Sequence, residues 1–476
     1  MAKRQNVESS GRGLFDEQSA HRRRLRPQRA LFIPHLLREK ADNNLLEEEQ
    51  GKAHEIAVHW ADLETNGHLP EYKETSIDKT FLDQLFGQGL GYRVKTESPA
   101  SWEMEHQFFV PSVGPADAAL GQFPASLAVP AAMVELKGAK TDLDRDKVNG
   151  RTAVQQCWDY LNAVPGCDWG IVSNFRSIRL YNREKGTQAY EEFTLQGLRV
   201  RKKFNEFFYL FHRDGLLPSR SGQQPRALAL LRETGERQRE VGNKLYDAYR
   251  WCRLELIQHL CRQERKSLDE AIRIAQKLLD RIIFIAFCED RGLLPEKSLE
   301  MTRDEVRSYS RAKNPAWENF LDLFTAIDKG AKGRRIISPF NGGLFADDSA
   351  INELELEDTK WTNFFANFGR FDFSEEVNVE VLGHLFERSI TELEKLRVGG
   401  LFALEANIEN PNGNGNGKTA RRQGTKGKSV AATTDTASPL SKMPKSAQRK
   451  RFGIYYTPPA FTGLIVERTI DALVRE

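Results

Sequence analysis

An acidic and a basic residue, Glu135 and Lys137, flank Leu136 at the end of the apolar run 127–134. Side chains alternate along a strand, so Glu135 and Lys137 are expected to point to the same side. A carboxylate can hold a divalent metal, and a neighbouring lysine can orient a water and stabilise the charge of a phosphodiester under attack. Asp117 lies upstream and supplies a second carboxylate. These residue types indicate a metal-dependent nuclease.

The sequence around the triplet decides whether it is a site, because 29% of the chain is charged and such triplets arise easily. A second triplet, Glu-Tyr-Lys at 71–73, lies in the polar stretch 69–76 with no apolar strand before it. An isolated triplet is read most simply as a solvated strand end. Glu135 instead follows a long apolar run, which is typical of a strand covered on both faces.

The elements predicted after the triplet have an α/β order. Residues 153–161 carry apolar side chains at helical spacing. Gln156 and Tyr160 are four residues apart and share a neighbouring face of that helix. Residues 169–173 and 178–181 read as two strands joined by a short hairpin. The predicted order is therefore one strand, then the strand that ends in Glu-x-Lys, then a helix, and then two further strands.

This order, with its Glu-x-Lys triplet and Gln-x-x-x-Tyr spacing, resembles the PD-(D/E)XK nuclease superfamily, and in particular the nuclease domain of type IIG restriction-modification enzymes. The resemblance implies a restriction-endonuclease-like α/β fold with a mixed sheet. It implies that Asp117 and Glu135 bind Mg²⁺, with the Leu136 carbonyl as a further ligand. It also implies that Lys137 is the catalytic lysine and Gln156 an accessory active-site residue.

Asp117 is the position at which the sequence departs from the family. One residue separates it from Pro115, whereas the family usually has Pro and Asp adjacent. The three aspartates within 142–146 are poor substitutes, because they follow Lys137 in a loop instead of preceding it on a neighbouring strand. Glu74 is an alternative extra ligand from a first helix, although a solvated helix face is the preferred explanation.

Composition limits the remaining choices. A chain of 476 residues is long enough for roughly three domains. No apolar run is long enough to span a bilayer, and the polar N-terminus lacks a signal-peptide core. The five cysteines show no C-x-x-C pair or zinc spacing, which predicts reduced, mostly buried thiols. We expect a cytoplasmic protein with no membrane partner.

The net charge of +3 conceals three basic clusters, at 22–29, 199–203 and 449–451. Such clusters neutralise phosphates and make DNA binding depend on salt. The alternative is that each cluster only keeps a surface solvated. Beside a nuclease signature, the three clusters favour double-stranded DNA as the partner.

Downstream of the predicted nuclease, the helical pattern of 225–295 is packing rather than chemistry. With the turn at 340–345 and a predicted helix at 381–387, its end resembles the helical connector that precedes the adenine methyltransferase domain in type IIG enzymes. Residues 410–445 have almost nothing to bury, so we expect a disordered linker.

The last segment carries the motif Gly-x-Tyr-Tyr-Thr-Pro, with Tyr455, Tyr456, Thr457 and Pro458. It resembles the opening motif of amino-adenine methyltransferases, which implies that these four residues line an S-adenosylmethionine pocket in the full-length fusion. The alternative is an ordinary helix start, with Thr as N-cap and Pro in the first turn. The family's glycine-rich cofactor loop and Asn-Pro-Pro-Tyr type motif would follow Glu476, so we expect no methylation by this chain alone.

A glycine-rich segment at 86–91 superficially resembles a cofactor loop. A nucleotide loop follows a strand and opens a helix, whereas this segment follows a helical pattern. We therefore expect a helix end and a turn into a strand at 92–94.

Five regions are predicted: a basic, partly disordered arm (1–50), a PD-(D/E)XK-like nuclease domain (51–215), a helical connector (216–405), a low-complexity linker (406–451) and the start of an adenine methyltransferase domain (452–476). The predicted function is the Mg²⁺-dependent endonuclease half of a type IIG restriction-modification protein, which cuts double-stranded foreign or phage DNA. A downstream methyltransferase and target-recognition domain are expected partners. One alternative is the N-terminal part of a phage-resistance adenine methyltransferase whose nuclease-like domain only binds DNA. Another is a DNA-binding scaffold without enzymatic activity.

Overall fold

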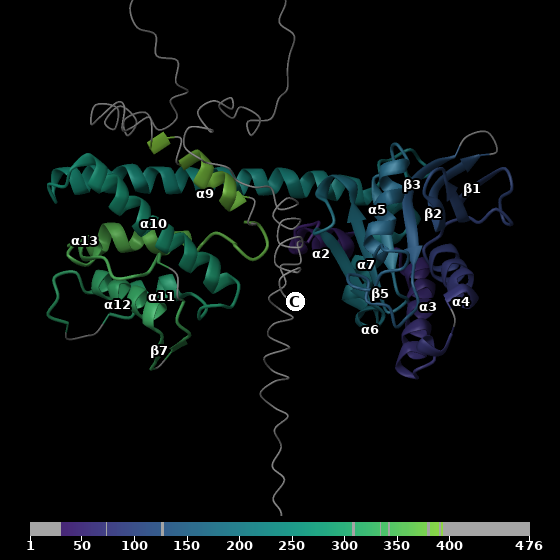
Figure 1. Cartoon of the computed structure of the whole chain (residues 1–476), viewed down its shortest axis with the longest axis horizontal. Helices are drawn as coiled ribbons and strands as arrows, with labels where there is room; N and C mark the ends of the chain where they lie inside the picture. Colours follow the sequence, from purple (N-terminus) through teal and green to yellow (C-terminus); the bar gives the residue numbers. More distant parts are fainter. Residues whose placement is uncertain are drawn as a thin grey trace, which may run out of the picture. The chain divides into compact units, whose positions relative to one another are not determined.

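The chain forms two compact units, which divide between Gly235 and Glu236 inside helix α9 (Arg226–Arg262). The computed structural model describes residues 30–72, 74–124, 128–306, 310–333, 335–340, 343–377, 381–389 and 392–393. Figure 1 labels the elements of both units. The first unit contains the predicted nuclease triplet and the second is helical.

The first unit is built on a six-stranded mixed sheet with the spatial order β1-β2-β3-β4-β5-β6. The strands are β1 (Ser101–Val110), β2 (Gly114–Pro124), β3 (Val129–Leu136), β4 (Trp169–Ser173), β5 (Ser177–Asn182) and β6 (Tyr190–Thr194). Only the β3–β4 pair is parallel, and the other four pairs are antiparallel. A parallel pair needs a crossover, and α5 (Ala153–Ala163) provides it. The predicted mixed sheet and the element order after the triplet are confirmed.

Helix α5 begins where the sequence supplies a reciprocal cap. The Thr152 side chain accepts from the Gln155 backbone N–H, and the Gln155 side chain accepts from the Thr152 backbone N–H. The helix packs on β3 and β4 (Figure 1). Gly170 in β4 permits this close packing, because a Cβ there would lie 2.7 Å from the Cys157 sulfur.

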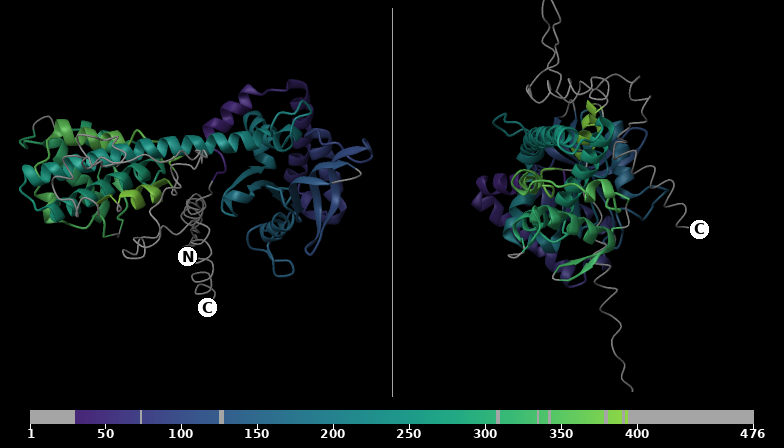
Figure 2. Two further views of the ribbon diagram at one scale, coloured as in Figure 1. Left: turned by 90° about the horizontal axis from the view of Figure 1, so that it is seen from above. Right: turned by 90° about the vertical axis from the view of Figure 1, so that its left-hand side faces the viewer.

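Helices that precede and follow the strands in the chain cover the opposite face of the sheet (Figure 2). They include α2 (Pro34–Asn43), α3 (Glu47–Thr65) and α7 (Arg201–Phe211). The shorter elements of this unit are η1 (Leu69–Glu71), α4 (Glu74–Phe81), η2 (Leu82–Gly89), η3 (Arg183–Lys185), α6 (Leu195–Leu198) and α8 (Arg213–Leu216). Val134 and Leu136 join this core, whereas Met133 joins the smaller core under α5. Strand β3 is thus covered on both faces, as its apolar run predicts.

The first unit is larger than the range 51–215 predicted from sequence. Leu37 and Ala41 of α2 are buried in its main core, and so are Ala227 and Leu231 of α9. The range 1–50 therefore contributes a packed helix. Its basic residues at 22–29 lie outside the described residues.

The strand predicted at 92–94 is wrong. Val94 makes only an isolated bridge with Met104, and η2 ends just before Gly91, which has a positive φ of 80°. The Arg93 carbonyl accepts from the backbone N–H groups of both Glu103 and Met104, at 2.8 and 3.2 Å. Because the start of β1 is irregular, residues 92–94 cannot pair with it as a regular strand. The expectation of a helix end and a turn at 86–91 is confirmed.

Most of the basic cluster at 199–203 serves the fold. Arg199 forms an ion pair with Asp62. Arg201 donates to the Gln50 carbonyl at 3.3 Å, and Lys203 pairs with Glu206 on its own helix. Three of the four cations in this cluster therefore have partners within the first unit.

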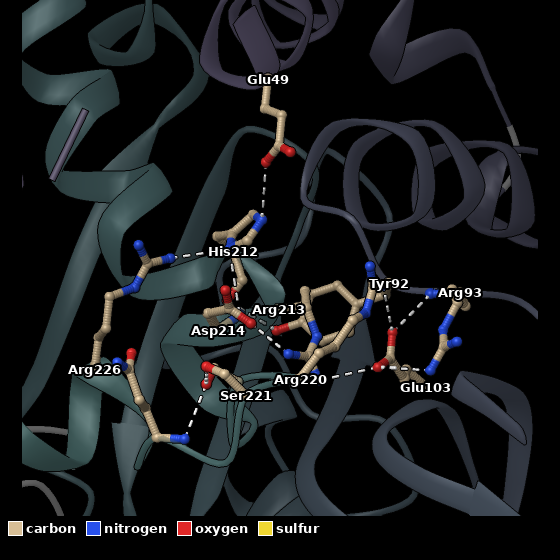
Figure 3. A network of polar contacts seen from close by, with 12 residues as sticks. Glu49, Tyr92, Arg93, Glu103, His212, Arg213, Asp214, Arg220, Ser221 and Arg226 are labelled. Carbon is tan, nitrogen blue, oxygen red and sulfur yellow. Dashed lines mark hydrogen bonds and ion pairs between the residues drawn. The ribbon is translucent and has the colours of Figure 1, made fainter. Parts of the chain in front are cut away.

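A polar network joins β1 to the α7–α8 junction (Figure 3). The buried Glu103 carboxylate accepts from Arg213 at 2.9 Å and from Arg93 at 3.3 Å, and Arg220 lies 3.6 Å away. Burial raises the pKa of Glu103, but the Arg93 backbone N–H and then the charges of Arg213 and Arg93 outweigh it and hold that pKa below its usual value. Charge pairing compensates this buried carboxylate.

His212 completes the network as a neutral acceptor. Its Nδ1 accepts from Arg226 at 2.9 Å and from the Asp214 backbone N–H at 3.2 Å (Figure 3). Burial and then the Arg226 charge lower the pKa of His212 to about 4. Protonation would remove an acceptor and place a second positive charge beside Arg226.

His212 should therefore make the protein less stable in acid. The unfolded chain takes up the proton on His212 near pH 6.5 and the folded chain only near pH 4. The stability that neutral His212 contributes is therefore complete above pH 6.5 and is lost as the pH falls toward 4. We expect a loss of roughly 1–3 kcal/mol of unfolding free energy across this window. Urea unfolding at several pH values checks it, with His212→Asn as the variant that keeps an acceptor. An equally steep pH dependence in His212→Asn would contradict this assignment.

The second unit packs helices around one apolar core. Its elements are the later part of α9, α10 (Leu268–Asp290), α11 (Ser298–Asp304), α12 (Pro315–Lys329), β7 (Ala331–Lys332), β8 (Ile336–Ile337), α13 (Ser349–Asn352), η4 (Asp358–Thr362) and α14 (Asn363–Phe368). Residues 381–389 are also helical, as predicted. Helix α10 ends at Asp290, and Gly292 follows with a positive φ of 67°. Asn341 and Gly342 of the predicted turn lie outside the described residues.

All five cysteines are free thiols, and four of them are buried, as predicted. Among the described residues, no helix combines the length and the apolar composition needed to cross a membrane.

Candidate functional site

The candidate site lies where strands β2 and β3 part. The β1–β2 ladder continues to the pair Val110–Gly114, whereas the β2–β3 ladder reaches only to Ala118–Val134. The same register, continued by one residue, sets Asp117 opposite Glu135. Both side chains share the face covered by α5, because Ala119 and Met133, two residues away, belong to the core under that helix.

Asp117 closes the gap between the parting strands. Its Oδ2 accepts from the Leu136 backbone N–H at 2.7 Å. The carboxylate thus replaces the backbone carbonyl that a continued ladder would supply. The residue that separates Pro115 from Asp117 does not displace Asp117 from Glu135, since strand alternation and register place the two together.

Glu135 and Lys137 form an ion pair with both side chains largely removed from water. The Lys137 backbone N–H donates to the Ser173 carbonyl at 2.8 Å, which extends the β3–β4 pairing to the end of the triplet. Glu135 Oε2 is buried and has no hydrogen-bond partner among the described residues. A buried carboxylate oxygen without a donor is costly, so this atom calls for an explanation.

Burial and the repulsion between the two neighbouring carboxylates disfavour the ionised forms of Asp117 and Glu135. Burial, and then the charge of Asp117, raises the pKa of Glu135 to about 7, while Lys137 opposes the rise. Burial likewise raises the pKa of Asp117, although the Leu136 N–H opposes it. A bound cation would stabilise the ionised form of both groups.

Gln156 reaches the site through Tyr160. Its Nε2 donates to the Tyr160 hydroxyl at 2.8 Å, and that hydroxyl donates to the Pro115 carbonyl at 2.8 Å. Tyr160 is buried, and burial together with the charge of Glu135 raises its pKa. The pair therefore anchors the start of β2, two residues before Asp117, to helix α5.

Sequence reasoning missed Gln107. It lies on β1 opposite Asp117, between the paired residues His106–Ala118 and Phe108–Ala116. Its Nε2 is 3.5 Å from Asp117 Oδ1. No feature of the sequence distinguishes this glutamine, because β1 itself was not predicted.

The alternative acidic residues bind elsewhere. Asp144 forms an ion pair with Arg179 at 2.9 Å, Asp142 accepts from the Asp144 N–H, and Asp146 accepts from the Asp142 N–H. They organise their own loop. The side chain of Glu74 lies outside the described residues, as do Tyr455, Tyr456, Thr457 and Pro458.

The donor set suits a hard cation such as Mg²⁺, which prefers oxygen ligands and is commonly held by one or two carboxylates. Asp117 and Glu135 are the two carboxylates, and the unpartnered Glu135 Oε2 fits a ligand atom. Within the described residues, no group of three or more His, Cys, Asp or Glu side chains is placed to hold a metal ion. A site here would rest on the carboxylate pair and neutral oxygens.

Comparison with known proteins gives one sequence match. The chain is 30% identical over 156 residues to a putative type II restriction enzyme and methyltransferase of Methanocaldococcus jannaschii, a match that covers 28% of this chain and 13% of the relative. A solved cryo-EM structure of a DrdV–DNA complex aligns with 71% of this chain and 28% of its own, at 12% identity and a TM-score of 0.23. No family model matches. The chain is thus similar to part of a restriction-modification protein and spans a small fraction of its length.

Proposed function

We propose that the first unit is a metal-dependent DNA endonuclease of the type II restriction class. One observation carries the proposal: Asp117 and Glu135 lie opposite one another at the parting of β2 and β3, beside Lys137, and a buried Glu135 oxygen has no donor. The similarity to a protein named as a restriction enzyme and methyltransferase supports the same class.

The proposed reaction is hydrolysis of a phosphodiester. A water oxygen bonds to phosphorus, the phosphorus bond to the leaving sugar oxygen breaks, and that oxygen gains a proton. Lys137 orients the attacking water and offsets the charge that grows on the phosphate. Tyr160 and Gln156 keep the Asp117 strand fixed against α5.

Asp117, Glu135 and the Leu136 carbonyl would hold Mg²⁺. When bound, the ion lowers the pKa of a coordinated water and stabilises phosphate charge. We further propose that the chain belongs to a longer protein that contains an S-adenosylmethionine-dependent adenine methyltransferase and a target-recognition domain. The cofactor pocket of that methyltransferase would begin with Tyr455, Tyr456, Thr457 and Pro458. Such a protein would act on double-stranded DNA in the cytoplasm as a defence against phage.

Cleavage in ¹⁸O-labelled water tests the reaction type. With Mg²⁺, the chain should cut duplex DNA and place one solvent oxygen in each new terminal phosphate, and EDTA should abolish cutting. DNA that stays intact with Mg²⁺, or that is cut equally with EDTA, would overturn the proposal. Parallel reactions with added S-adenosylmethionine would show whether cleavage depends on it.

A further inference from the structure

Gln107 has a backbone conformation that a strand does not require. Its φ is +50°, in the left-handed region, although it is not a glycine and lies inside β1. The pairs on either side, His106–Ala118 and Phe108–Ala116, keep one constant register, so no inserted residue accounts for it. Such a conformation is strained in a residue with a side chain.

The strained residue faces the candidate site. Gln107, Asp117 and Glu135 form one row across β1, β2 and β3 by register. The Gln107 carboxamide approaches Asp117 Oδ1 at 3.5 Å, while the Leu136 N–H holds Oδ2 at 2.7 Å. The two oxygens of Asp117 therefore each have a separate donor, on opposite neighbouring strands.

Packing gives a reason for the backbone conformation but not for the glutamine: Met104 belongs to the main core and Val110 to the core under α5, so β1 changes face between these two residues. The side chain is exposed, and its amide contributes nothing to the apolar cores of the unit. A glycine would adopt the same φ without strain. The amide itself, placed by the unusual backbone, is the feature that distinguishes this position.

We propose that Gln107 is a positioning residue, which fixes the Asp117 carboxylate in the orientation that binds a divalent cation. The inference rests on the proposed function, because it assumes that Asp117 is a ligand. Two donors prevent the carboxylate from rotating, so less orientational freedom is lost when a cation binds. Groups that orient metal ligands in this way typically change metal affinity by roughly 10–100-fold when removed.

Cation affinity tests the proposal without DNA. Isothermal titration of the full chain with Mn²⁺ should show about tenfold weaker binding for both Gln107→Gly and Gln107→Leu. The first variant relieves the backbone and the second keeps the bulk, but both lack the amide. Ser112→Gly is the matched control, since Ser112 lies in the adjoining turn with a positive φ of 67° and should bind as wild type does.

The possible results separate this inference from the proposed function. Wild-type affinity in either Gln107 variant, or an equal loss in Ser112→Gly, would overturn the role of the amide. Asp117→Ala should bind Mn²⁺ far more weakly than any Gln107 variant. If Asp117→Ala binds Mn²⁺ like wild type, the metal site itself is wrong. If only Asp117→Ala loses affinity, the site stands and the role of Gln107 fails.

Discussion

Lys137→Ala should reduce the single-turnover rate of DNA cleavage by about 10³-fold while leaving DNA binding and Mn²⁺ binding close to wild type. The lysine adjoins the carboxylate pair but is not a ligand in the proposed site. In the proposed mechanism, its ammonium group offsets charge that appears only as phosphorus is attacked. Replacing Lys137 by alanine should therefore raise the activation free energy of cleavage without weakening the binding of DNA or Mn²⁺.

Lys140→Ala is the control for this substitution. Lys140 is exposed in the loop that follows the triplet and has the same charge. Its removal should leave the cleavage rate within a few-fold of wild type. A comparable loss in both variants would show that general positive charge, rather than the position of Lys137, supports cleavage.

Glu135→Gln should abolish cleavage and yet stabilise the cation-free protein. The folded pKa of Glu135 is about 7 against an ordinary value of 4.5. The stability contributed by the protonated group is fully present below pH 4.5 and is lost as the pH rises through 7. A neutral amide avoids that loss, so we expect a gain of roughly 2 kcal/mol in unfolding free energy at about pH 8 and little gain at about pH 5.

Urea unfolding of the cation-free protein measures this gain. Glu103→Gln is the contrasting control, because the Arg93 backbone N–H and then the charge of Arg213 hold the pKa of that buried carboxylate below its usual value. The same substitution there should destabilise the protein, since it removes the buried charge that Arg213 and Arg93 share. Equal destabilisation by Glu103→Gln and Glu135→Gln would contradict the picture of a site with excess negative charge.

The sequence predicts the part of this site that local patterns control. The apolar run before Glu135 marks a strand buried on both faces, and β3 is such a strand. The apolar spacing after Ala153 predicts α5, and the two apolar segments beyond it give the β4–β5 hairpin. These elements follow from periodicity within one segment, so neighbouring residues are enough to identify them.

The remaining features depend on contacts between distant segments. Strand β1 has alternating apolar residues at Trp102, Met104, Phe108 and Val110, but its Gln107 faces Asp117 only because β1 pairs with β2. The position of Tyr160 against Pro115 likewise depends on how α5 crosses the sheet. The parting of β2 from β3 at Asp117 is a property of two ladders, which the sequence of one strand does not contain.

In the proposed site, the Asp117–Glu135 pair and Lys137 form a metal-dependent centre for cutting DNA. Cleavage of supercoiled plasmid in the presence of Mg²⁺ tests this centre most directly. Wild type and Glu135→Ala are compared at equal amounts of DNA-bound protein. The wild-type chain should nick or linearise the plasmid, and Glu135→Ala should leave it supercoiled. Cutting by Glu135→Ala at the wild-type rate would contradict the claim.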